Sequence, residues 1–115
     1  MLNKVVRAIS VCVLLVTSVQ SAFAADPVEG KINNIITYTT FGSGDVVFSL
    51  EASVNGCDNG YWLRKSDPGF NSTLSILLSA YHAKTTVKVF GHDDQLWNGS
   101  NSGKYCRLDW LRLID

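Results

Sequence analysis

Residues 71–84 read NSTLSILLSAYHAK and give the chain its clearest secondary-structure signal. Their apolar side chains recur at the i, i+3, i+4 and i+7 spacing of one helix face. That face consists of Leu74, Leu77, Leu78 and Tyr81, and it is broadened by Ile76 and Ala80. Asn71 or Ser72 can accept hydrogen bonds from the first backbone N–H groups, and Lys84 suits the negative end of the helix dipole. The spacing therefore predicts a capped helix that ends at Ala83 or Lys84 and buries this face.

Strand patterns lie on both sides of this helix. Five segments alternate apolar and polar residues or are rich in β-branched and aromatic residues. They are residues 31–40, 46–52, 61–65, 85–90 and 105–114. Turn-forming residues separate them, with Asn55-Gly56 as the strongest hairpin signal, and residues 91–104 are expected to form a long polar loop. In the last segment Cys106, Leu108 and Trp110 share one face, so Trp110 is expected in the core.

The order of these elements predicts the architecture. Five strands with one helix between the third and the fourth match the connectivity of a five-stranded Greek-key barrel, the OB-fold. We therefore expect a small, mainly β, α+β domain of OB-like form, in which the helix closes one end of the barrel. A different small α+β sandwich is the main alternative. Neither an internal repeat nor a linker is visible, so residues 25–115 are expected to form one domain.

The first residues have the pattern of an export signal. Lys4 and Arg7 form a positive start, residues 8–16 are apolar, and Ala22 and Ala24 occupy the small-residue positions before a cleavage site. An uncleaved membrane anchor is the alternative, but it needs roughly 20 apolar residues, and polar residues from Thr17 onward interrupt this run. We therefore expect residues 1–24 to be a cleaved signal peptide. The remaining domain is expected in the periplasm or outside the cell, without membrane insertion.

Composition excludes several classes of protein. The 46% hydrophobic and 10% aromatic content of the 115 residues argues against a disordered chain. Without Lys4 and Arg7, eight basic and ten acidic residues remain, a formal charge of about −2. A protein that binds nucleic acid or an anionic membrane by charge would need a basic face. Neither partner is therefore expected.

Two cysteines, Cys57 and Cys106, remain after the predicted cleavage. In an exported domain with an even number of cysteines, the usual outcome is a disulfide, and two cysteines allow one connectivity. A metal pair or a redox pair is the alternative, but the spacing is not C-x-x-C and no further soft ligand lies nearby. We therefore expect a structural disulfide.

Candidates for catalysis are few. The histidines are His82 and His92, and His92 is followed by two acidic residues, Asp93 and Asp94. This triplet could ligate a divalent ion or form a minimal hydrolase, but a metal site needs three or four ligands on a stiff frame. No nucleophile motif such as G-x-S-x-G is present. The expectation is therefore no enzyme, no metal and no cofactor.

Binding residues are easier to find. Aromatic rings can stack on the apolar faces of sugars, and amide and carboxylate groups can bind sugar hydroxyls. The candidates of these types are Trp62, Asp94, Gln95, Trp97 and Asn98. They predict an exported, non-enzymatic binding module for a glycan or protein receptor, with a homo-oligomer as one form of assembly. The alternative is a periplasmic structural or inhibitory protein that binds another protein.

A resemblance to known proteins rests on a few motifs. They are Gly56-Cys57, Gly60-Tyr61-Trp62, residues 74–81, Val87-Lys88-Val89, and Cys106 before residues 108–114. In these features the chain resembles a class of small, exported, uncharacterised bacterial proteins. The helix followed by V-x-V is also similar to the pentameric, glycan-receptor-binding B subunits of bacterial A–B toxins, which are OB-folds. This resemblance implies a fold and a class of receptor, but no receptor-contact residue of those toxins has a counterpart here.

Overall fold

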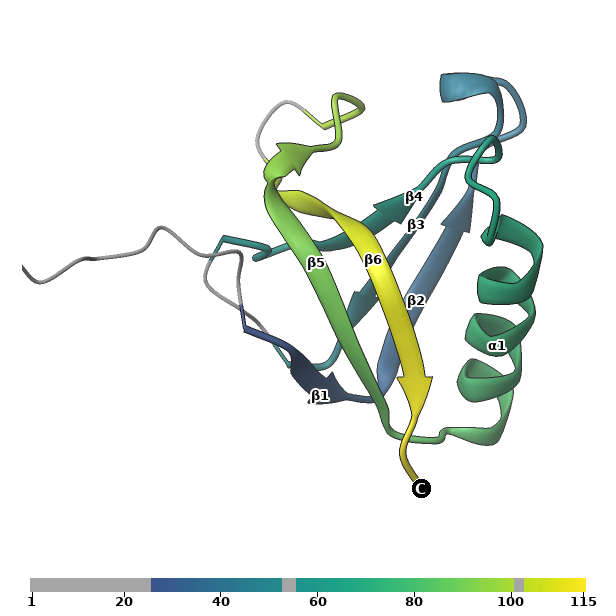
Figure 1. Cartoon of the computed structure of the whole chain (residues 1–115), viewed down its shortest axis with the longest axis vertical. Helices are drawn as coiled ribbons and strands as arrows, with labels where there is room; N and C mark the ends of the chain where they lie inside the picture. The colour runs from purple at the N-terminus through teal and green to yellow at the C-terminus, as the bar shows by residue number, and fades with distance from the viewer. Residues whose placement is uncertain (1–25, 53–55, 101–102) are drawn as a thin grey trace, which may run out of the picture.

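The computed structural model describes residues 26–52, 56–100 and 103–115, so the predicted signal peptide lies outside the described residues. These residues form six strands, one α-helix and a short 3-10 helix. The elements are β1 (Val28–Gly30), β2 (Ile32–Thr37), η1 (Phe41–Ser43), β3 (Val46–Leu50), β4 (Gly60–Leu63), α1 (Phe70–Ala83), β5 (Val87–Leu96) and β6 (Tyr105–Leu113). Figure 1 shows β5 and β6 crossing in front of β2, β3 and β4, with α1 at the side. The prediction of a small, mainly β domain with one helix is confirmed.

The sheet has the order β1-β5-β6-β4-β3-β2. Strands β2, β3 and β4 form an antiparallel meander, β5 and β6 are antiparallel, and β4 runs parallel to β6. Strands β1 and β2 stand at opposite ends of this order, although Lys31 alone separates them in the chain. One continuous segment therefore supplies both edges of the sheet.

The predicted number of five strands is wrong, because β1 precedes the first predicted strand, residues 31–40, and was not predicted, whereas β2 lies within that segment. β1 pairs with β5 through Val28 and Val89, whereas β2 pairs with β3 through Ile35 and Phe48. The partners of β1 are about sixty positions away in the chain, and a strand of three residues has too little pattern of its own to be recognised. As a result, the helix follows the fourth strand and not the third.

The predicted loop from residue 91 is also wrong at its start, because β5 continues to Leu96. Backbone pairing with β6 holds this polar part of the strand, with His92 opposite Arg107 and Leu96 opposite Cys106. The sequence suggested a turn because Gly91 follows the β-branched run. In the fold, Gly91 is needed for another reason: a Cβ atom there would lie 2.7 Å from the ring of Tyr61.

Helix α1 is confirmed, but its cap and its buried face differ from the prediction. It begins at Phe70 after Gly69, without a side-chain cap from Asn71 or Ser72. It ends at Ala83, and Lys84 is the C-cap, with a φ of 55°. Phe70, Leu77 and Ala80 are buried, whereas Ile76, Leu78 and Tyr81 are exposed, Leu78 to 41% and Tyr81 to 40%. Phe70 anchors the start of the helix in the core and so sets its rotation. Leu78 then lies about 100° around the axis from Leu77.

The core lies between the inner sheet face and α1, and the disulfide passes through it. Phe48, Leu77 and Val89 are fully buried there. The predicted bond between Cys57 and Cys106 is present, with an S–S distance of 1.98 Å, and ties the segment before β4 to β6. The expectation that Trp110 lies in the core is wrong: it stacks on Phe90 at a ring-centroid distance of 6.0 Å, and it is only half-buried. A shift in register between β5 and β6 next to Phe90 interrupts the simple alternation on which that expectation depended.

Tyr61 is expected to make the fold less stable at alkaline pH. Its ring is 2% exposed, and burial raises its pKa from 10.0 to about 12. The unfolded chain releases this proton at lower pH than the folded one. The free energy of unfolding therefore keeps this contribution in full below about pH 10. It falls by about 3 kcal/mol as the pH rises to about 12. Urea unfolding across this range should show the loss in the wild type. Tyr61→Phe should remove that part of the pH dependence, and the exposed-residue control Tyr81→Phe should keep it.

Candidate functional site

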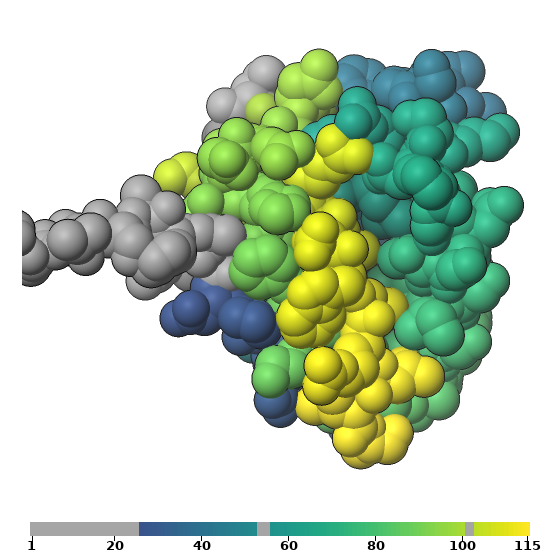
Figure 2. Space-filling view, viewed as in Figure 1, coloured from purple at the N-terminus to yellow at the C-terminus, as the bar shows by residue number. Residues whose placement is uncertain are grey.

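A groove opens where β4 and β6 separate. The two strands are paired only as far as Trp62 and Arg107, after which β4 ends at Leu63 and β6 continues to Leu113. The surface is hollowed between the yellow atoms of β6 and the teal atoms of the segment that leads into α1 (Figure 2). The groove has a volume of about 400 Å³ and is lined by Leu63, Asp67, Pro68, Gly69, Phe70, Thr73, His92, Gln95, Arg107, Leu108 and Asp109. Pockets of this size accept small ligands.

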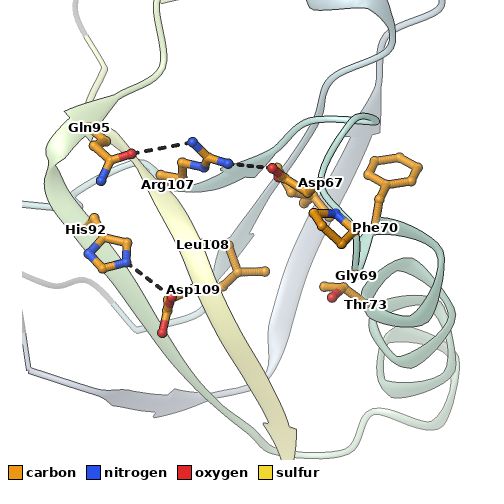
Figure 3. A pocket seen from close by; sticks show the side chains of 11 residues that line it. Asp67, Gly69, Phe70, Thr73, His92, Gln95, Arg107, Leu108 and Asp109 are labelled. Atoms are coloured by element: carbon orange, nitrogen blue, oxygen red, sulfur yellow. Dashed lines mark hydrogen bonds and ion pairs between the residues drawn. The ribbon is translucent and has the colours of Figure 1, made fainter.

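Arg107 lies at one wall of the groove and is held from three directions. Its Nη2 atom donates to the Asp67 carboxylate, and its Nη1 atom donates to Oε1 of Gln95 at 3.5 Å. Figure 3 shows this chain of contacts across the groove. The guanidinium carbon also lies 5.7 Å from the centre of the Trp62 ring, within cation–π range. The guanidinium is therefore fixed in direction before any ligand arrives.

Asp67 connects this arginine to the turn that leads into the helix. Its Oδ2 atom accepts a hydrogen bond from the backbone N–H of Arg64 at 3.1 Å, and the backbone N–H of Asp67 donates to the carbonyl of Arg64 at 3.0 Å. The backbone N–H of Phe70 donates in turn to the Asp67 carbonyl. The turn, the start of α1 and Arg107 thus share one anchor, which makes this wall of the groove rigid.

A second polar pair faces the groove from β5 and β6. The Nε2 atom of His92 lies 3.2 Å from Oδ1 of Asp109, and both side chains are partly exposed (Figure 3). The sequence suggested Asp93 and Asp94 as the partners of His92, but the acidic side chain within ion-pair distance comes from the neighbouring strand. Among the described residues no group of three or more potential ligands could hold a metal ion.

The predicted binding residues fall into three groups. Trp62 and Gln95 come together at the groove, because the indole Nε1 atom of Trp62 donates to the backbone carbonyl of Gln95 at 2.9 Å. Asp94 and Asn98 are exposed but do not line the groove. Trp97 lies elsewhere, and its side chain is only 5% exposed.

Trp97 belongs to an aromatic cluster beside the 3-10 helix. Its ring lies between 5.3 and 5.5 Å from the rings of Tyr38, Phe41 and Tyr105. Its Nε1 atom donates to the buried carboxylate of Asp45 at 2.9 Å. The polar atom of this indole is therefore already used inside the fold, and the ring joins two loops.

Sequence reasoning did not select Asp67, Arg107 or Asp109 as site residues. In the sequence, Asp67 lies in a turn that interrupts the sheet. With Glu51, Asp58 and Asp109 it was also a possible member of a carboxylate pair for glycoside hydrolysis, but nothing in their spacing distinguishes two of the four. Arg107 and Asp109 alternate with Cys106 and Leu108, which indicates that they share the outer face of the last strand. That signal could have identified them as surface residues, but their partners Gln95 and His92 became neighbours only through strand pairing.

Comparisons of the chain with protein families, with curated proteins and with solved structures found no match. The interpretation of the groove therefore depends on its own chemistry. Arg107 supplies N–H donors, Asp67 and Asp109 supply acceptors, and Leu63 and Leu108 supply an apolar surface. This combination can bind a ligand that carries both hydroxyl groups and C–H surfaces.

In the part of the chain that the structure describes, none of the helices has the length and apolar character of a membrane span.

Proposed function

We propose that this protein is an exported, non-enzymatic binding module whose groove between β6 and the start of α1 holds a glycan. The observation that carries the proposal is the Arg107 guanidinium, which Asp67, Gln95 and Trp62 hold in one orientation at the groove wall. A fixed donor loses little conformational entropy when a ligand binds, so more of the interaction energy contributes to affinity.

The chemistry of the groove favours a polyhydroxylated ligand. Each sugar hydroxyl can donate one hydrogen bond and accept others, and the groove offers both donors and acceptors in the Arg107–Asp67 and His92–Asp109 pairs. A compact ion such as phosphate would face two carboxylates in the same space. A purely apolar ligand would leave these charged groups without water.

The topology of the sheet supports the predicted OB-like architecture. We propose that the sheet closes as an OB-like Greek-key barrel, in which β1 and β2 are the two halves of one bent strand. The strand order, the parallel pairing of β4 with β6 and the single residue between β1 and β2 support this form. A similar architecture is implied by the resemblance to toxin B subunits.

Export is the second part of the proposal. The positive start, the apolar run and the small residues before Ala25 support a cleaved signal. The disulfide between Cys57 and Cys106 is of a kind that persists in oxidising compartments. Periplasm and extracellular medium are both compatible with these features.

A glycan array with the oxidised domain of residues 25–115 tests the binding role. We expect binding by the wild type and a loss of about ten-fold or more in Arg107→Met, because a charge-assisted hydrogen bond contributes roughly 1.5–3 kcal/mol. Gln95→Ala, at an exposed position, should weaken binding without affecting folding. Lys104→Met, which also removes a positive charge but lies outside the groove lining, should bind like the wild type.

The alternative is a protein partner, and a specific surface favours it. Helix α1 exposes Leu78 and Tyr81, which are three positions apart and lie on the same side of the helix, so the sheet leaves part of this apolar side uncovered. Absence of glycan binding, together with a stoichiometric envelope protein whose capture is lost in Leu78→Ala, would replace the glycan proposal with this one. Capture that depends on neither Leu78 nor Arg107 would contradict both.

A further inference from the structure

A strip of aromatic and basic side chains lies on the outer face of β5 and β6, beyond the groove. It consists of Lys88, Phe90, Trp110 and Arg112, and we call it the aromatic–basic strip. The rings of Phe90 and Trp110 are cross-strand partners and stack at 6.0 Å with an angle of 20° between their planes. The guanidinium carbon of Arg112 lies 5.5 Å from the centre of the Trp110 ring. The two rings therefore form one aromatic pair with a cation beside it.

The charges of the strip are not balanced. Lys88 and Arg112 are register partners, so their side chains project from the same face, and like charges opposite each other in a sheet are unfavourable. Glu29 from β1 approaches Lys88, with 3.9 Å between Oε2 and Nζ. Within the residues that the structure describes, no carboxylate lies within ion-pair distance of Arg112. An anionic group on a ligand would relieve this repulsion.

The strip continues directly into the groove. The ring of His92 lies edge-on to Phe90 at 5.5 Å, and His92 pairs with Asp109, the residue before Trp110. Both His92 and Asp109 line the groove. A ligand longer than the groove could thus extend along β5 and β6 from Arg107 to Arg112.

We infer that the aromatic–basic strip is a second subsite of the glycan site, and that the ligand is an oligosaccharide that carries a carboxylate. This inference rests on the proposed function of the groove. The apolar face of a sugar ring packs against the stacked Phe90–Trp110 pair, and the carboxylate binds the guanidinium fork of Arg112, with Lys88 as a second cation. A nucleic acid is the less favoured ligand, because Glu29 and Asp109 border the strip and would repel a continuous phosphate backbone.

The test uses two matched probes: a uronic-acid-containing oligosaccharide and the same oligosaccharide with its carboxylates reduced to alcohols. By calorimetry, the wild type should bind the acidic probe about ten-fold tighter than the reduced one, as expected for a charged hydrogen bond. Arg112→Gln should lose this preference and keep its affinity for the reduced probe. Trp110→Leu should weaken the binding of both probes. Lys104→Gln is the control for the loss of one positive charge outside the strip.

The outcomes separate the two proposals. Equal binding of both probes by the wild type, or a preference that survives in Arg112→Gln, overturns the second subsite and leaves the groove as a glycan site. Absence of binding to either probe and to the wider glycan array overturns the proposed function and the subsite together. Tighter binding of a single-stranded oligonucleotide than of the acidic probe also overturns the inference.

Discussion

Replacement of both Cys57 and Cys106 by alanine is expected to lower the free energy of unfolding by about 4 kcal/mol. The bond joins residues 49 positions apart, so its removal restores the conformational freedom of a long loop to the unfolded chain. For a domain of this size, the change corresponds to a melting temperature lower by roughly 20 °C. Thermal and urea unfolding of the double variant, beside the oxidised wild type, measure the loss.

Reduction of the wild type provides the matched control, because it opens the same loop without a change of sequence. Reduced wild type and double variant should unfold at similar urea concentrations. A loss below about 1 kcal/mol in both would contradict the assignment of the disulfide as a major source of stability. Equal glycan binding by all three forms under native conditions would show that the bond acts on stability and not on the groove.

Leu77→Ala is expected to cost about 3 kcal/mol of unfolding free energy, whereas Leu78→Ala should cost less than about 1 kcal/mol. Leu77 is fully buried between α1 and the sheet, and its truncation leaves a cavity that the neighbouring side chains cannot fill. Leu78 is next in the chain but 41% exposed. The two variants differ by one position on the same helix, so intrinsic helix propensity cancels in the comparison.

Urea unfolding monitored by circular dichroism measures both values. Equal losses, or a larger loss for Leu78→Ala, would mean that the helix is rotated relative to the arrangement described here. A larger loss for Leu78 that appears only at high protein concentration would instead indicate a self-association surface on α1.

The difference between these two leucines shows where sequence periodicity reaches its limit. An i, i+3, i+4, i+7 pattern identifies a helix and its apolar side, but a stripe of six apolar residues is wide enough to permit several rotations. The burial of Phe70, one residue before the predicted start at residue 71, fixes one of these rotations. Ile76, Leu78 and Tyr81 were left at the margins of the stripe.

The strands show a similar division. β3 lies within the predicted segment 46–52, whose alternation is a local signal for a strand. β4 overlaps the predicted segment 61–65 but begins one residue earlier, at Gly60. β1 and the second half of β5 have no such pattern. Their backbone groups are paired by partners distant in the chain, and this pairing does not depend on hydropathy.

The groove could be predicted even less well than the strands, because its residues come from distant parts of the chain. Trp62 and Gln95 could be selected by residue type, since aromatic and amide side chains suit a polar ligand. Their neighbour Arg107 and its anchor Asp67 are 40 positions apart, and no spacing rule links them. Conversely, Trp97 was chosen for its composition and is committed to a hydrogen bond with Asp45, which is 52 positions away.

The amino-acid sequence was therefore sufficient for one helix, most of the strands, the pairing of Cys57 with Cys106 and the candidate export signal, because each depends on local pattern or on simple counting. The folded chain was required for the rotation of α1, for the pairing of the short strand β1 with β5, and for the meeting of Asp67, Gln95 and Arg107. These features result from contacts between distant segments, and the free energy of such contacts depends on how the sheet closes and on what the helix covers, which no local window of sequence contains.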